Sequence, residues 1–183
     1  MIIETDRLRL RQWKKRDREP FSVLNSDSEV MQYFPALLNK FESDAMLLKF
    51  QLLISKNGWG FWACELKDSG EFIGFIGLHA PEAGLPFEPC IEIGWRIAKK
   101  YWGCGYATEA AQACVDFGFK TLNLESIVSF AVKSNSRSIA VMERIGMSNT
   151  NRNFEHPKVN VSHLKEHVLY EIHSNGSGSV YSN

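Results

Sequence analysis

The 183-residue sequence has no segment resembling a membrane span, which needs about 18 consecutive apolar residues. Residues 1–11 contain several charged side chains, so they lack the apolar stretch of a secretory signal. Basic and acidic residues number 21 each, which gives a formal net charge of zero. This balance offers no argument for nucleic acid or an anionic membrane as a partner. We expect a cytoplasmic protein that binds neither.

Cysteine is also scarce. The four cysteines form no C-x-x-C pair and no spacing typical of a metal site: Cys64, Cys90, Cys104 and Cys114. We expect reduced, mostly buried thiols and no metal. His163 and His167 match the zinc pattern H-x-x-E-H, but that pattern works only on a helix. The residues that follow favour a strand, on which these histidines would stand about 13 Å apart.

The pattern of apolar residues predicts seven strands and four helices, arranged as a single domain over residues 1–173. Alternating or continuous apolar runs indicate strands at 6–12, 59–66, 71–78, 90–97, 123–132, 147–152 and 166–172. Helical spacing appears around 21–34, from 43–44 to 57, at 105–118 and at 134–145. The order predicts an α+β domain with a mixed, mostly antiparallel sheet that opens near its middle. Residues 174–183, rich in Ser, Gly and Asn, are expected to form a flexible tail.

A glycine-containing turn joins the strand at 90–97 to the next helix. It contains Trp102, Gly103, Cys104, Gly105, Tyr106, Ala107 and Thr108. The first backbone N–H groups of a helix have no intrahelical partner and lie at the positive end of its dipole, so they bind anions. Glycines without Cβ atoms allow a diphosphate to approach the backbone closely. The turn therefore indicates a cofactor that carries a pyrophosphate.

Two other phosphate-binding motifs fit this turn less well. A P-loop requires Gly-Lys-Ser/Thr, whereas this turn has Gly-Tyr-Ala. A dinucleotide fingerprint is G-x-G-x-x-G, and Thr108 occupies its last position, although Glu125 lies where that motif has an acid. The separation of the strand from Gly103, and the presence of only one strand-helix-strand unit, argue against this fingerprint. A helix-start turn with no ligand is the remaining alternative to coenzyme A.

Three motifs together resemble the GCN5-related N-acetyltransferases (GNAT). They are I-E-I-G-W-R-I at 91–97, W-G-C-G-Y-A-T-E-A at 102–110, and N-S-R-S at 135–138 followed by M-E-R-I-G-M at 142–147. Within that family the chain looks like the RimJ/RimL-like branch, which acetylates the N-termini of ribosomal proteins. The resemblance covers nearly the whole sequence. It implies the GNAT fold, acetyl-CoA as co-substrate and an amine acceptor.

The resemblance also implies which residues bind the cofactor. The pyrophosphate would lie on the backbone of residues 102–108, and the pantetheine arm along Trp95, Ile97 and Ala98. Asn135 would bond that arm from the opposite wall. A backbone N–H near Ile97 would polarise the thioester carbonyl. Cys104 departs from the Lys or Arg of many relatives, so a charge that faces the phosphates is missing.

Two residues are candidates for catalysis. Glu92 would take the proton from the amine, through water; alternatively, it is an ordinary strand residue or pairs with Arg96. Ser138 would protonate the leaving thiolate, as implied by the RimJ/RimL-like branch, or would only bond the cofactor or backbone. Many relatives use a Tyr where this chain has Met142, which cannot donate.

The acceptor is open to several interpretations. A protein N-terminus, including that of a ribosomal protein, and small amines are equally compatible with the sequence, and the chain would act as a monomer or homodimer. His79 and His156 either line the acceptor cleft or are hydrogen-bonded structural residues. A function from another class is a non-catalytic module that binds or senses acyl-CoA.

Overall fold

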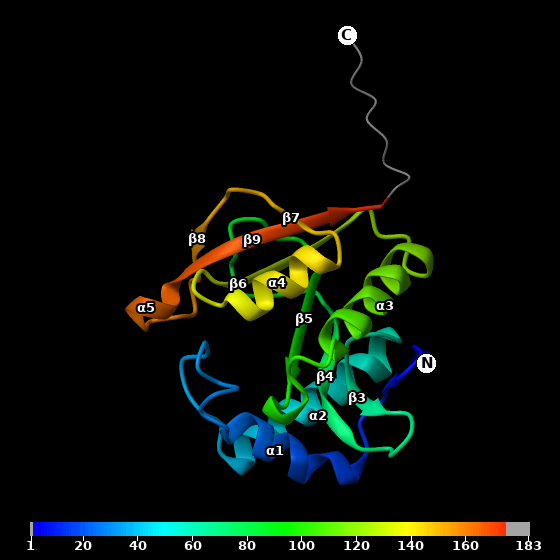
Figure 1. The fold of residues 1–183 in the computed structure, drawn as a ribbon. Coiled ribbons are helices and arrows are strands. Elements are labelled where there is room, and N and C mark those ends of the chain that lie inside the picture. The colour runs from blue at the N-terminus through cyan, green and yellow to red at the C-terminus, as the bar shows by residue number, and fades with distance from the viewer. Residues whose placement is uncertain (1, 175–183) are drawn as a thin grey trace.

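The computed structural model describes residues 2–174, and most of the predicted tail, 175–183, lies outside them. Within the described residues there are nine strands and five α-helices (Figure 1). The strands are β1 Ile3–Glu4, β2 Leu8–Arg11, β3 Phe61–Leu66, β4 Phe72–His79, β5 Glu92–Ile97, β6 Ser126–Val132, β7 Ser148–Asn149, β8 Phe154–Glu155 and β9 Glu166–His173. The helices are α1 Arg18–Ser26, α2 Lys40–Asn57, α3 Tyr106–Lys120, α4 Ser136–Arg144 and α5 Ser162–Lys165. Two short 3₁₀ helices cover Lys15–Asp17 and Lys99–Tyr101.

The predicted α+β class is confirmed, while the element count was too low. The additional elements are β1, β8 and α5, of two, two and four residues. Elements this short contain barely one period of an apolar pattern, so periodicity does not detect them. Helix α2 begins a turn earlier than predicted, because Asn39 accepts the N–H of Glu42 and Glu42 accepts the N–H of Asn39. Gly58 ends α2 in the left-handed conformation.

The sheet is mixed and opens at its middle, as predicted. Its strand order is β1-β2-β3-β4-β5-β6-β9-β7, with β8 also pairing with β9. Neighbouring strands are antiparallel except β5 and β6, which are parallel and connected through α3. Their register contains a single pair, Glu92 with Val128. The sheet therefore separates beyond this pair, with β6 and β9 on one side and β1–β5 on the other (Figure 1).

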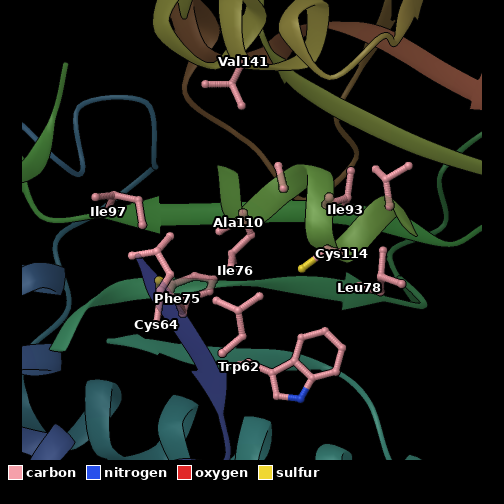
Figure 2. Packing of buried hydrophobic residues seen from close by; sticks show 14 of the residues in the cluster. Trp62, Cys64, Phe75, Ile76, Leu78, Ile93, Ile97, Ala110, Cys114 and Val141 are labelled. Atoms are coloured by element: carbon pink, nitrogen blue, oxygen red, sulfur yellow. The ribbon is translucent and has the colours of Figure 1, made fainter. Parts of the chain in front are cut away.

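Different helices cover the two faces of β4 and β5. On one face, Phe75 packs its ring against Phe21 of α1 and Phe50 of α2, at 5.9 and 5.2 Å. On the other face, Trp62 contacts Phe117 of α3 edge to face at 5.4 Å. Figure 2 shows Trp62, Ile76 and Leu78 gathered against Ala110 and Cys114 of α3. Small residues on α3 therefore let this helix lie close to the sheet, as the sequence indicated.

The cysteines differ in exposure. Cys64 and Cys114 are buried, Cys90 is partly buried and Cys104 is exposed, and all four are free thiols. Burial raises the pKa of Cys64 to about 12, so it stays protonated and behaves as a small apolar side chain. Among residues 2–174, no helix is long and apolar enough to cross a membrane.

Gly74 occupies a position where the backbone of β5 leaves no room for a side chain. Its φ is +147°, and a Cβ added there would lie 2.1 Å from the carbonyl oxygen of Arg96. Gly58 also has a positive φ, +81°, but no atom lies within 4 Å of its added Cβ. Both glycines therefore adopt a positive φ that a residue with a Cβ disfavours, but only at Gly74 would a Cβ also collide with the backbone of β5.

We predict that Gly74→Ala destabilises the fold far more than Gly58→Ala. The cost at Gly58 should be about 1 kcal/mol, the cost of a left-handed conformation for a residue with a Cβ. At Gly74 the displacement of β5 should raise the loss to about 3 kcal/mol or more. Urea unfolding of both variants measures the difference, and equal losses would contradict the close approach of β5 at Gly74.

Candidate active site

A cleft of about 890 Å³ lies where β5 ends and α3 begins. Its walls are the C-terminal end of β5, the first turn of α3, one side of α4 and the loop that contains Tyr33 and Phe34. The structure brings most of the predicted cofactor residues to this cleft: Trp95, Ile97, Trp102, Gly103, Gly105, Tyr106, Ala107, Thr108, Asn135 and Ser138. Glu92, Ala98 and Cys104 are not among its lining residues.

The edge of β5 offers unpaired peptide groups to this cleft. Ala98 donates its N–H to the carbonyl of Ile73 on the neighbouring strand β4, at 2.9 Å. Successive residues of a strand direct their peptide groups to opposite sides, so those of Trp95 and Ile97 point away from β4, toward β6. Because β6 diverges after the Glu92–Val128 pair, it does not meet these groups. The carbonyl of Ile97 accepts from Trp102 Nε1 at 2.8 Å, which leaves the N–H of Ile97 and both peptide groups of Trp95.

Ala98 differs from its expected role. Its N–H is used by Ile73, and its carbonyl accepts the N–H of Tyr101 at 2.9 Å. Both peptide groups are therefore engaged within the protein. Of the three residues predicted along this edge, Trp95 and Ile97 therefore keep unpaired peptide groups, and Ala98 does not.

The turn before α3 presents free backbone amides. Gly103 and Gly105 have φ values of +76° and +80°, which a residue with a Cβ adopts only at a cost. The first hydrogen bond of α3 runs from the N–H of Glu109 to the carbonyl of Gly105, at 3.0 Å. The amides of residues 106–108 therefore have no intrahelical partner, and within residues 2–174 no side chain caps this helix. The positive end of the α3 dipole faces the cleft.

Arg7 stabilises this turn from the other end of the chain. Its guanidinium lies over the ring of Tyr106 at 4.5 Å, donates to the carbonyl of Cys104 at 3.0 Å and pairs with Glu109 at 2.6 Å. Thr5 also donates to Glu109, at 2.6 Å. Burial opposes ionisation of Glu109, but the bonds from Thr5 and Arg7 outweigh it and hold its pKa below the ordinary value. Arg7 was not among the residues predicted for the site, because no local pattern connects residues about 100 positions apart.

The electrostatic character of the cleft is basic. Arg96, Arg137 and Arg144 line it, and Arg137 lies over the ring of Trp102 at 4.0 Å. Among the lining residues the one carboxylate is Glu109, which Arg7 neutralises. The cleft therefore favours anionic ligands, although the net charge of the whole chain is zero.

Helix α4 forms the opposite wall. Asn135 caps it, with the side-chain oxygen accepting the N–H of Ser138 at 3.2 Å, so its amide NH₂ is directed outward from that bond. Ser138 is partly buried and lines the cleft. Met142 is 1% exposed and belongs to the core, so the position at which many relatives have Tyr does not line the cleft here. Tyr33 donates to the carbonyl of Ser134 at 3.1 Å and so joins the two walls.

Glu92 lies on the face of β5 that α1 and α2 cover. Its register partner on β4 is His79, and its Oε1 would be 3.5 Å from a Cβ at Gly94. Within the described residues the carboxyl makes no hydrogen bond or ion pair, and burial raises its pKa to about 8. The alternative pairing with Arg96 is wrong, because Arg96 donates to Asn25 Oδ1 instead. A carboxyl with this pKa exchanges a proton near neutral pH.

The histidines fall in different places. His79 packs against the ring of Phe61 at 5.3 Å, near Glu92, and burial lowers its pKa. His156 packs 5.2 Å from His167, away from the residues that line the cleft. His163 lies in α5 rather than on a strand, contrary to the prediction, while His167 is on β9 as expected.

Comparison with known proteins agrees with this geometry. Residues 7–148 match the family model of the acetyltransferase (GNAT) domain. YkkB of Bacillus subtilis is 36% identical over 156 residues, which cover 84% of this chain and 90% of YkkB. The N-acetyltransferase YnaD of the same organism is 33% identical over 157 residues, 80% of this chain and 82% of YnaD.

A solved structure shows the same architecture. The GNAT-family acetyltransferase from Bacillus anthracis superimposes with a TM-score of 0.80 at 28% identity, covering 94% of this chain and 98% of its own. These matches extend over most of the chain, including the elements that form the cleft. The chain belongs to the GNAT family of acetyltransferases and is an acyl-CoA-dependent acyltransferase.

Proposed function

We propose that this chain transfers acetyl from acetyl-CoA to a primary amine by direct attack in a ternary complex. The observation that carries the proposal is one cleft bounded by two sets of unpaired backbone groups. The amides at the start of α3 suit a diphosphate, and the open edge of β5 suits an extended arm with amide groups. A cleft of about 890 Å³ with Arg137 and Arg144 in its wall fits an anionic ligand as large as coenzyme A.

The chain's own residues supply the binding of coenzyme A. The amides of residues 103–108 would hold the diphosphate, the peptide groups of Trp95 and Ile97 would pair with the pantetheine arm, and the Asn135 amide would bond it from α4. Acetyl-CoA supplies a thioester, at whose carbonyl carbon the amine forms a new C–N bond as the C–S bond breaks. The N–H of Ile97 stabilises the oxyanion that develops there.

Proton transfers complete the reaction. An alkyl ammonium has a pKa of about 10 and is unreactive until it loses a proton. Glu92, with a free carboxyl and a raised pKa, accepts that proton through water. Ser138, on the opposite wall, donates to the departing sulfur. His79 lies beside Glu92 on the neighbouring strand, so it would add a second polar side chain where the amine binds.

Two acceptor classes are consistent with this site: a protein N-terminus, including that of a ribosomal protein, and a small amine. The first follows from the resemblance to the RimJ/RimL-like branch.

Release of free thiol from acetyl-CoA, measured with a panel of amines, tests the proposal. We expect amine-dependent release with formation of the N-acetyl product. Micromolar binding of coenzyme A with no thiol release for any amine would support the binding module instead. Absence of coenzyme A binding would refute both functions.

Replacement of Glu92 should remove the proton acceptor. We expect Glu92→Gln to lower kcat by about 10²–10³-fold, the usual contribution of a general base. Because burial raises the Glu92 pKa to about 8, the carboxylate fraction increases as pH rises through that value. The kcat/KM of the wild type should therefore rise through about pH 8, with a step that the variant lacks. Glu125→Gln is the control, since Glu125 is exposed and outside the cleft; a wild-type pH profile in Glu92→Gln would rule out Glu92 as the base.

Restoring a cation to the turn should strengthen coenzyme A binding. Cys104 is exposed beside Gly103 and Gly105, and Arg7, which contacts its carbonyl, is already paired with Glu109. We expect Cys104→Lys to lower the Kd for coenzyme A by about 2–5-fold at low salt, less at high salt, because exposed charge pairs are weak and screened. Cys104→Ser is the neutral control in the same calorimetric titration. An unchanged or higher Kd for the lysine variant would contradict a diphosphate at this turn.

A further inference from the structure

Arg96 is a buried cation in the wall of the cleft. It lies on β5, is 7% exposed, and stacks its guanidinium over the ring of Phe34 at 4.1 Å, with Phe75 at 5.3 Å. Its Nη1 donates to Asn25 Oδ1, while Nε is buried with no partner. Within residues 2–174 no carboxylate pairs with it.

Such an arrangement is costly without a ligand. Buried charges are almost always paired, and a buried donor without an acceptor destabilises the fold. Burial lowers the pKa of Arg96 to about 10, which still leaves it charged at neutral pH. Stacking on two aromatic rings offsets part of this cost but does not satisfy the Nε–H.

The orientation of the Arg96 guanidinium is fixed by its bond to Asn25. Asn25 and Ser43 are both 0% exposed, and Asn25 Nδ2 donates to Ser43 Oγ at 2.9 Å. This bond directs Asn25 Oδ1 at Arg96 Nη1. The guanidinium is thus held through Nη1, and a planar acceptor such as a carboxylate, which a guanidinium binds well, would reach it from the cleft that Arg96 lines.

The location of Arg96 indicates whether it faces the diphosphate of the cofactor or the acceptor. Its side chain and that of Glu92 share the face of β5 covered by α1 and α2, with Gly94 between them, and their Cα atoms lie roughly 13 Å apart along the strand. The amides proposed for the diphosphate are at the start of α3, which packs on the opposite face. Arg96 therefore faces the side from which the amine would reach Glu92, rather than the phosphates.

We propose that Arg96 binds a carboxylate of the acceptor, so that the substrate class is amines that carry a carboxylate several bonds from the reacting nitrogen. This inference rests on the proposed acetyltransferase function. It identifies Arg96 as a specificity-determining residue, with Glu92 at the amine end and Arg96 at the carboxylate end. A polyamine would place positive charge against Arg96 and should be a poor acceptor.

The test compares pairs of acceptors in which one member carries a carboxylate and the other the corresponding uncharged amide. Amino acids, dipeptides and ω-amino carboxylates are each assayed beside the corresponding amide, with spermidine included, by thiol release from acetyl-CoA. For the best acid of the panel, we expect the wild type to prefer it over its amide by at least about 10-fold in kcat/KM. Arg96→Gln should abolish this preference by slowing the acid, with little change for the amide, and Arg96→Lys should restore part of it. Arg18→Gln removes an exposed charge on α1 and should keep the wild-type preference.

Binding of coenzyme A to each variant supplies the second measurement. An unchanged Kd in Arg96→Gln, together with wild-type circular dichroism, shows that the loss concerns the acceptor. A weaker Kd, with acids and amides slowed equally, would place Arg96 on the cofactor and overturn the inference. Turnover of amines with no preference for acids in the wild type would overturn it while leaving the proposed function intact. No thiol release with any amine would refute both.

Discussion

Strands β5 and β6 pair only at Glu92 and Val128 and then diverge, and the site depends on this separation. In a closed sheet the peptide groups of Trp95 and Ile97 would bond to β6, and a buried backbone donor or acceptor without a partner is unfavourable. Here α4, α3 and the loop containing Tyr33 surround the opening, so the unpaired groups face a cleft instead of a core. The small residues of α3 hold its first turn beside the same opening.

The cleft has two chemically distinct sides. Toward α3 it offers backbone amides, a helix dipole and Arg137, which suit phosphate. Toward α1 and α2, the cleft is lined by Arg96, a cation held by Asn25, and Glu92 carries an unpaired carboxyl on the same face of β5, outside the lining residues. Along β5, Glu92 and Arg96 lie on one face, while the peptide groups of Trp95 and Ile97 lie along the open edge. In the proposed function, one strand would thus bind the donor along its edge and present Glu92 and Arg96 to the acceptor on its face.

Much of this arrangement followed from the sequence. The alternation of 6–12, the apolar runs of 71–78 and 90–97, and the small-residue pattern of 107–118 predicted the mixed sheet and its crossover helix. The motif at 102–108 predicted free amides, because glycines before a helix leave its first turn uncapped. Interactions between distant residues were not predictable. Neither the bond of Arg7 to Glu109 nor that of Arg96 to Asn25 has a local pattern, and the bond from the Ala98 N–H to Ile73 depends on the register of β4.

A structure of the chain with acetyl-CoA tests the central claim most directly. The account predicts diphosphate oxygens about 2.7–3.2 Å from the amides of residues 103–108, and pantetheine amides paired with Trp95 in the opening between β5 and β6. It also predicts the thioester carbonyl near the N–H of Ile97. A diphosphate bound away from the start of α3, or a cofactor that leaves the edge of β5 unpaired, would contradict it.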